Sequence, residues 1–212
     1  MADMSMNKAI HAAVRRDLDR FVAALEAFHA GDRVRAQQLR SAWANFDDEL
    51  TRHHEGEHRI AWPALASVGV SADLLAQLDT EHAAMADALA QTGSAMDAFA
   101  GTATADDAAA ALDAFRRLRE VTEAHLEHEE AETESVYLDR RDAPEIKAMG
   151  RAFSRAQGPA QAGRFFAWLL DGARPQEKAA ITSEIPGPVV TVLTGLFGRS
   201  YRREVAPVWR NT

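Results

Sequence analysis

A repeated His-x-x-x-Glu motif constrains the fold of this 212-residue chain more than any other feature of its sequence. The first copy joins His53 to Glu57, and the second joins His125 to Glu129. Both residues of the second copy lie 72 positions after their counterparts (125 − 53 and 129 − 57). Because residues four apart share one face of an α-helix, each copy can present an imidazole and a carboxylate to the same ion.

Two further histidines follow nearly the same spacing. His11 begins the stretch His-Ala-Ala-Val, His82 begins His-Ala-Ala-Met, and the two are 71 positions apart (82 − 11). Each half of the repeat therefore supplies one histidine and then one His-x-x-x-Glu motif. This order predicts a helical hairpin that is used twice, with four histidines and two glutamates facing inward.

Apolar residues recur every three or four positions in four long segments, which is the pattern of amphipathic helices. The predicted helices span residues 5–29, 32–62, 71–101 and 104–137. Pro63 is expected to end the second helix, Ser71 to cap the third, and Thr104 to begin the fourth. Four long helices with short connections predict an all-α fold, an up-down-up-down four-helix bundle over residues 5–140.

The remainder, residues 141–212, has a different character. Gly158-Pro159, Arg174-Pro175 and Pro186-Gly187-Pro188 divide it into short pieces that are rich in apolar and aromatic residues. A segment this apolar is expected to be covered rather than to be an exposed tail. We predict a C-terminal helical extension that packs on the bundle or on a partner subunit, which allows a homodimer through these helices.

Composition excludes several classes of protein. The formal net charge of −8 argues against general nucleic-acid binding, which needs a basic surface. Cysteine is absent, so disulfides, zinc-thiolate sites, iron–sulfur clusters and thiol nucleophiles are excluded. Met1 to Met6 lack the apolar core of a signal peptide, and no apolar run reaches the length of a membrane span. We expect a cytoplasmic protein with neither nucleic acid nor a membrane as its partner.

The six repeated residues predict a metal centre. Burying six ionisable groups in a helical bundle without partners would cost several kcal/mol for each group, and a pair of cations would remove that cost. Mixed imidazole and carboxylate ligands suit iron, manganese or zinc better than magnesium or calcium. We expect two iron ions, with zinc or manganese as alternatives that suit the same ligands. The predicted metal ligands are His11, His53, Glu57, His82, His125 and Glu129.

Several stretches resemble the hemerythrin-like, His-His-Glu cation-binding family. Residues 53–65 (His-His-Glu-Gly-Glu-His-Arg-Ile-Ala-Trp-Pro-Ala-Leu) are similar to that family's second helix, Glu81-His82 to its third, and residues 125–130 to its fourth. The resemblance covers residues 7–140 and leaves the extension outside it. It implies a four-helix bundle with a dinuclear iron centre, and its ligand pattern carries over to the six residues named above.

Two positions depart from the oxygen-carrying members of that family. Those proteins have a second histidine one turn after the position of His82, where this chain has Ala86. Their carboxylate in the fourth helix lies five residues after the histidine, at Glu130 in this chain, whereas symmetry with Glu57 favours Glu129. The departure at Ala86 implies that one metal ion has fewer protein ligands, and hence an open position that favours exchange or redox chemistry.

The other histidines are expected to have lesser roles. Each helical residue advances by ~100°, so His54 should be rotated away from a site that contains His53. His58 and His128 are expected in outer contacts or in solvent, and Glu130 on a solvated acidic face. The sequence nevertheless leaves open that Glu130, His54 or His58 replaces or supplements one of the predicted ligands.

These features favour one function and leave two alternatives. The leading hypothesis is a non-haem di-iron protein that binds or senses oxygen, nitric oxide or peroxide. The first alternative is a di-iron enzyme that consumes peroxide, although no residue stands out as its proton donor. The second alternative is a metal-free helical interaction module in which the C-terminal region binds a partner.

Overall fold

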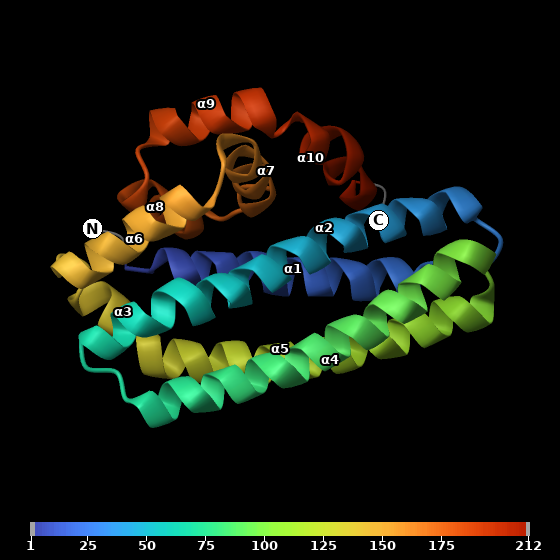
Figure 1. Ribbon diagram of the computed structural model, residues 1–212. Coiled ribbons are helices and arrows are strands. Elements are labelled where there is room, and N and C mark those ends of the chain that lie inside the picture. Colours follow the sequence, from blue (N-terminus) through green and yellow to red (C-terminus); the bar gives the residue numbers. More distant parts are fainter. Residues whose placement is uncertain (1–2, 211–212) are drawn as a thin grey trace.

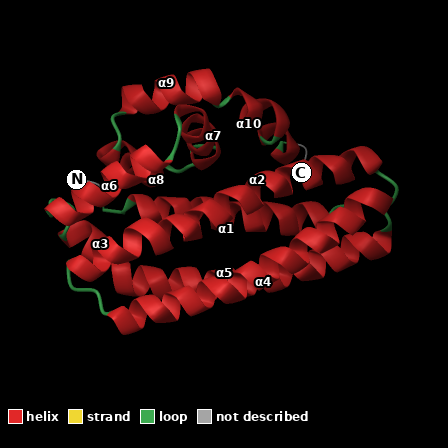
Figure 2. Cartoon of the chain, in the orientation of Figure 1, coloured by secondary structure: helices red, strands yellow, loops and turns green. Residues whose placement is uncertain are grey.

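In the computed structural model, every regular element within residues 3–210 is a helix (Figure 2), which confirms the all-α prediction. The structure describes these residues only. Residues 1–2, part of the segment predicted to lack a signal peptide, and residues 211–212, part of the predicted C-terminal extension, lie outside the described residues. The elements are α1 (Met6–Glu26), α2 (Arg33–Gly56), the π-helical turn η1 (Glu57–Ala61), α3 (Trp62–Ser67), α4 (Ala72–Thr102), α5 (Ala105–Asp139), α6 (Pro144–Ala156), α7 (Pro159–Leu169), α8 (Pro175–Glu184), α9 (Gly187–Phe197), α10 (Arg199–Glu204) and the 3₁₀ turn η2 (Ala206–Trp209).

Side-chain caps set the starts of the long helices. The Ser71 hydroxyl accepts a hydrogen bond from the backbone N–H of Leu74, and the Thr104 hydroxyl accepts one from Asp107. Each bond satisfies one of the amide groups that the first turn of a helix leaves without a partner. The predicted starts of the third and fourth long helices are therefore confirmed.

The four long helices α1, α2, α4 and α5 lie side by side (Figure 1), with α5 packed on both α1 and α4. An aromatic cluster fills the space between them toward one end. Phe21 stacks on Phe115 with ring centroids 4.4 Å apart, and Trp43 meets Phe115 edge to face at 5.3 Å. All three side chains are buried. This apolar half holds the helices in register and leaves the opposite half for the ionisable residues.

The prediction that Pro63 ends the second helix is wrong. The helical path continues through η1 and α3 as far as Ser67. Within η1 the backbone N–H of Trp62 bonds to the carbonyl of Glu57, a wider turn than that of an α-helix. Pro63 then falls in the first turn of α3. Amide groups in the first turn of a helix make no intrahelical hydrogen bond, so the lack of an N–H in proline costs little there.

The C-terminal segment packs over α1 and α2 (Figure 1). Helices α7 and α8 contact α1, α10 and η2 contact α2, and α6 lies against α3. Asp17 on α1 is the buried polar anchor of this contact, because its Oδ2 accepts a 2.7 Å hydrogen bond from Trp168 Nε1 on α7. The segment beyond residue 141 is therefore held on the long helices by a specific buried contact as well as by apolar packing.

Within residues 3–210, no single helix combines the length and the apolar composition that crossing a membrane requires; α8 and α9 satisfy the criterion only as a pair with a sharp bend between them.

Glu49 on α2 is a buried carboxyl group without an ionic partner within salt-bridge distance in the described chain, and we predict that it costs stability at neutral pH. Burial, reinforced by Asp48, raises the pKa of Glu49 to about 8, although Arg164 opposes the shift. The folded protein therefore keeps a proton that the unfolded chain releases above its ordinary pKa of 4.5, so stability falls as the pH rises from 4.5 to 8.

Glu49→Gln is thus expected to raise the free energy of unfolding by about 2–4 kcal/mol at pH 8 and to change it little at pH 5. Urea unfolding at both pH values measures the difference. Glu55→Gln, at an exposed residue of the same helix, is the control and should change little at either pH. An equal gain from Glu49→Gln at both pH values would show that the effect comes from packing rather than from ionisation.

Candidate metal centre

One cluster gathers around Glu129 of α5. Its Oε2 lies 3.3 Å from His11 Nε2 on α1 and 3.5 Å from His125 Nε2 one turn earlier on α5. The other carboxylate oxygen, Oε1, accepts a 2.8 Å hydrogen bond from Asn7 Nδ2. All three of the predicted residues are buried. Glu130, by contrast, does not point into this cluster.

A second cluster gathers around Glu57, where α2 passes into η1. Its Oε1 lies 3.2 Å from His53 Nε2, and its Oε2 lies 3.4 Å from His82 Nε2 on α4. His82 Nε2 is in turn 3.0 Å from His125 Nε2, which joins this cluster to the one around Glu129. The structure thus brings all six predicted residues together, and every imidazole presents its Nε2 to a neighbouring ligand atom.

The expectation that His54 faces away from the site is wrong. His54 is buried, and its ring stacks on that of His82 with centroids 4.2 Å apart and planes inclined by 20°. One potential ligand atom from each of His54, Glu57, His82 and His125 lies within 4.8 Å of the others. A second group with the same property consists of His11, His53 and Glu57.

Glu57 is therefore common to two groups that could each hold an ion. The two groups lie side by side, so together they extend over more of the surface of α2 than a single side chain covers. The adjacent residues His53 and His54 can therefore each contribute to one group. The sequence signal was present, because Glu57 follows His54 by three positions and His53 by four. The group of His54, Glu57, His82 and His125 contains three imidazoles, so His54 makes up for the histidine that Ala86 was expected to leave out.

Several buried ligand atoms make no hydrogen bond within the described chain, namely His53 Nε2, His54 Nε2, both carboxylate oxygens of Glu57 and Oε2 of Glu129. Buried polar atoms are normally paired, and leaving one unpaired costs about 1–3 kcal/mol. Carboxylate oxygens and imidazole nitrogens that lack donors are what a divalent cation needs as ligands. The donor set of this site therefore suits a bound metal.

Burial also sets the charge of the imidazoles. Burial first, and then the neighbouring His125, lower the pKa of His82 from 6.5 to about 4. Burial likewise lowers the pKa values of His53 and His54 well below 6.5. These rings are neutral at pH 7, so their Nε2 lone pairs can bind a metal without first losing a proton.

The pKa values of the two inward carboxyl groups, Glu57 and Glu129, shift in opposite directions. Burial, and then repulsion by Glu129, raise the pKa of Glu57 well above its ordinary value. Burial acts on Glu129 in the same sense, but His11 outweighs it and holds the pKa of Glu129 well below its ordinary value. Proximity of one carboxylate thus makes ionisation of the other unfavourable, and a cation between them would relieve that repulsion.

Two carboxylates outside the cluster each orient one of these rings. His11 donates from Nδ1 to Glu130 Oε1 over 3.1 Å, and His125 donates from Nδ1 to Glu81 Oε2 over 2.8 Å. Placing the proton on Nδ1 leaves the Nε2 lone pair directed inward, an arrangement common in metal sites. Glu130, expected on a solvated face, is half-buried and is held by Arg15.

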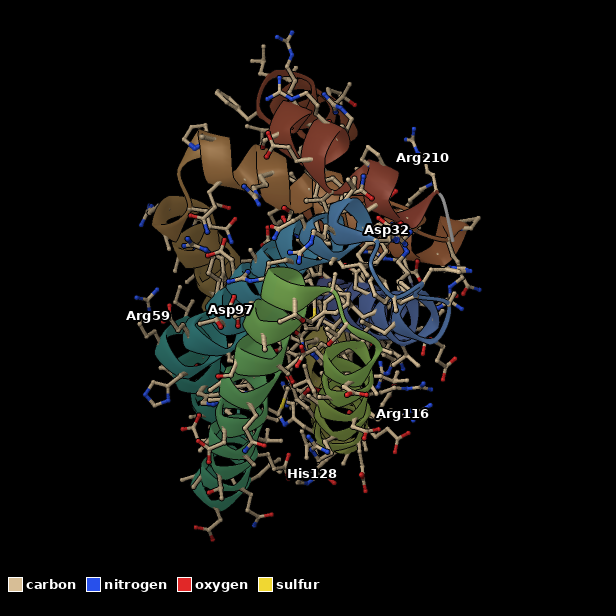
Figure 3. The ribbon with its side chains drawn as sticks, turned by 90° about the vertical axis from the view of Figure 1, so that its right-hand side faces the viewer. Asp32, Arg59, Asp97, Arg116, His128 and Arg210 are labelled. Carbon is tan, nitrogen blue, oxygen red and sulfur yellow. The ribbon has the colours of Figure 1, made fainter. Side chains whose placement is uncertain are left out.

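The remaining histidines lie outside the cluster, as predicted. The His58 side chain is 68% exposed and donates from Nδ1 to Asp79, whose other oxygen accepts from Trp62 Nε1. His128 bonds to Glu81 from the side of the molecule formed by α4 and α5 (Figure 3). The same view shows charged side chains such as Arg59 and Arg116 projecting from the outer surfaces of the helices.

The chain matches the Hemerythrin HHE cation binding domain over residues 5–137, and it belongs to that family. The match confirms the predicted resemblance and fits the buried cluster of histidines and glutamates described above. Comparison with curated proteins and with solved structures gave no match.

His54→Ala is expected to weaken metal binding by the group of His54, Glu57, His82 and His125 by more than about 100-fold, since even outer partners of metal ligands are worth 10–100-fold. Metal binding by the group of His11, His53 and Glu57 should remain. Metal content after equilibrium dialysis against ferrous iron measures the effect. His29→Ala, at an exposed residue, is the control. Unchanged stoichiometry and affinity in His54→Ala would exclude His54 as a ligand.

Proposed function

We propose that this protein is a non-haem di-iron protein that binds or senses oxygen, nitric oxide or peroxide. The observation that carries the proposal is the position of Glu57, which belongs to both groups of ligand atoms. A shared carboxylate suits two ions held side by side better than one ion or none. The proposed ligands are His11, His53, His54, Glu57, His82, His125 and Glu129.

The assignment of residues to ions follows the two groups. His11 and His53 would hold one ion, and His54, His82 and His125 would hold the other, with Glu57 between them. Glu129 approaches one imidazole of each group, His11 and His125, and would supply the second carboxylate of the centre. A bound pair of irons would supply reversible one-electron chemistry and a place for a small ligand. Iron is our choice over zinc and manganese, which the same ligands accept.

The protein around the centre performs three tasks in this proposal. Burial excludes bulk water, so electrostatic interactions at the ligands are stronger than at a surface. Glu130 and Glu81 fix the rings of His11 and His125. The neutral state of His82 lets the site accept a cation at pH 7.

We propose further that residues 5–140 form an up-down-up-down bundle that carries the centre, and that residues 141–212 form a separate extension. Helices α7, α8 and α10 of the extension contact α1 and α2, which contribute His11, His53 and His54. Ile146 of α6 belongs to a core cluster that also contains Leu78 and Tyr137. A cytoplasmic location, with neither nucleic acid nor a membrane as partner, remains a prediction.

The test is metal content and optical spectroscopy on protein loaded anaerobically with ferrous iron. Two irons per chain, with a spectrum that changes on addition of oxygen, nitric oxide or peroxide, is the expected result. Catalytic loss of peroxide that disappears in His53→Ala would favour the enzyme alternative. Absence of bound metal after loading, together with unchanged stability of a His53→Ala, His125→Ala double variant, would support the metal-free module instead.

A further inference from the structure

Helix α9 exposes an apolar face that the proposed metal centre does not explain. Within residues 3–210, five large hydrophobic side chains are exposed, and four of them lie on α9. They are Val189, Val192, Leu196 and Phe197, of which Val192 and Leu196 are 57% and 60% exposed. The helix lies on the outer side of the extension, away from the four long helices (Figure 1). Its sequence contains no ionisable residue. Three of them, Val189, Val192 and Leu196, follow one another at spacings of three and four residues and so share one helix face, while Phe197 begins beside Gly163 of α7. An exposed apolar face of this kind indicates an interaction surface.

The opposite face of α9 fixes its orientation. Val190 is buried, and the helix lies so close to α7 that a Cβ atom on Gly163 would be 2.4 Å from the carbonyl oxygen of Leu193. Such a contact tolerates only glycine at position 163. Rotating α9 to bury its exposed residues within the same chain would break this packing, so the fold of this chain leaves them exposed.

Small residues beside the apolar side chains permit close approach of a second helix. A Cβ atom on Gly195 would meet nothing within 4 Å. Thr191, one turn earlier, is also exposed. Helix axes approach to 8–10 Å where such small residues lie at the contact. The face therefore suits packing against another helix.

The charges that flank α9 favour a second copy in one orientation. Glu184 precedes the helix, Arg199 and Arg202 follow it, and all three are exposed. Glu184 ends α8, which meets the N-terminal end of α9 at a bend of 101°, and Arg199 begins α10 just after α9 ends. If two copies pair antiparallel with the twofold axis at Val192, the acidic end of each α9 therefore lies toward the basic end of the other. A parallel pair would place like charges together. An anionic lipid surface would attract the arginines but repel Glu184.

We propose that the exposed face of α9 is a homodimer interface in which two antiparallel α9 helices pack about a twofold axis at Val192. In this arrangement the exposed face of α9 on one subunit covers the same face on the other, as in most symmetric dimers. The antiparallel arrangement also sets the N-terminus of each α9 beside the C-terminus of the other, where the helix dipoles attract. This inference concerns a surface far from the metal ligands and does not depend on the proposed function.

The first test uses the absence of cysteine from the chain. A residue on a twofold axis lies beside its own copy, so Val192→Cys is expected to form a disulfide-linked dimer. Each bond converts two thiols to one disulfide, with two electrons and two protons passing to added oxidised glutathione. The product has twice the chain mass of 23.2 kDa. Val34→Cys, at a residue 70% exposed on α2, is the matched control and should form no disulfide-linked dimer.

The second test measures dimerisation of the full chain by sedimentation equilibrium. Val192→Glu is expected to weaken the dimer by about tenfold or more, because like charges meet at the axis, and Val34→Glu should leave it unchanged. Glu184→Arg and Arg199→Glu should each weaken it, and the double exchange should restore it. A monomeric wild-type chain, equal effects of Val34→Glu and Val192→Glu, or binding to anionic vesicles without self-association would each overturn the proposal.

Discussion

Glu57→Ala is expected to remove both metal ions from the protein, whereas loss of any one histidine should remove at most one. The reason is geometric, because Glu57 alone belongs to both groups of ligand atoms in the described structure. Its two oxygens lie 3.2 Å from His53 Nε2 and 3.4 Å from His82 Nε2, on either side of the centre. In the proposed centre, removing Glu57 would take a ligand from each ion and, among residues 3–210, would leave Glu129 as the remaining inward carboxylate.

The effect of Glu57→Ala on the free energy of unfolding should be stabilising without metal and destabilising with bound iron. In the metal-free protein, the raised pKa of Glu57 means that its burial opposes folding above pH 4.5, so Glu57→Ala should stabilise the protein at pH 7. In wild type, iron at 100 times its dissociation constant should add about 2.7 kcal/mol, and the variant should lose that gain. Thermal unfolding with and without ferrous iron, combined with metal analysis, measures both effects.

Glu55→Ala is the matched control for this experiment. Glu55 lies two residues earlier in the same helix, carries the same charge and is exposed. It should leave the metal content and the iron-dependent stabilisation unchanged. One tightly held ion per chain in Glu57→Ala would show that Glu57 serves a single metal position and would contradict the shared-carboxylate assignment.

The inward residues could be predicted because the repeat and the helical period point to the same positions. His11, His53, His82 and His125 occur in two matched pairs, and each falls on an apolar stripe. A four-residue spacing then selects Glu57. These are local properties of a regular helix, and the sequence contains them in full.

His54 and Pro63 could not be predicted because each depends on a departure from such regularity. The angular argument against His54 assumed a site as narrow as one helical face, whereas the centre spans two ligand groups that share Glu57. The prediction at Pro63 assumed an unbroken α-helical turn before it. The π turn η1 removes the conflict with the proline ring, and no propensity of these residues indicates such a turn.

The outer carboxylates illustrate a different limit. Glu81 and Glu130 stand beside other acidic residues, and nothing in their local sequence separates an orienting carboxylate from a solvated one. Their roles arise from contacts between helices far apart in the chain, such as His11 with Glu130 across 119 positions. The position of the extension on α1 is beyond prediction for the same reason, since Asp17 and Trp168 are 151 positions apart.

Asp17→Ala is expected to have the largest effect on stability outside the metal centre. The Asp17 side chain is 2% exposed and accepts three hydrogen bonds, from Trp168 Nε1 at 2.7 Å, Arg16 Nε at 2.8 Å and Arg20 Nη1 at 3.0 Å. Removing one member of a buried, hydrogen-bonded charge group costs about 3–5 kcal/mol, because the remaining groups lose their partner. For a chain of this length that loss lowers Tm by about 10 °C.

The consequence should be concentrated in the extension. Arg20 also pairs with Asp171, and Tyr201 donates to the same carboxylate over 2.9 Å, so the Asp17 contact is continuous with those that hold α7 and α10. Loss of Asp17 should therefore increase cleavage by trypsin within residues 141–210 before the long helices are cut. Asp17→Asn keeps an acceptor for Trp168 but loses the charge, and should fall between wild type and Asp17→Ala.

Asp19→Ala separates this interpretation from a general effect of removing an acidic residue from α1. Asp19 is two residues away, its side chain is 63% exposed, and its ion pair with Arg119 at 3.3 Å lies on the surface. Exposed pairs contribute about 0–1 kcal/mol, so Asp19→Ala should change Tm by no more than about 3 °C. If Asp17→Ala were equally mild, apolar packing of Phe166 and Leu169 alone would hold the extension. The buried anchor would then serve to fix the orientation of α7 rather than to stabilise the fold.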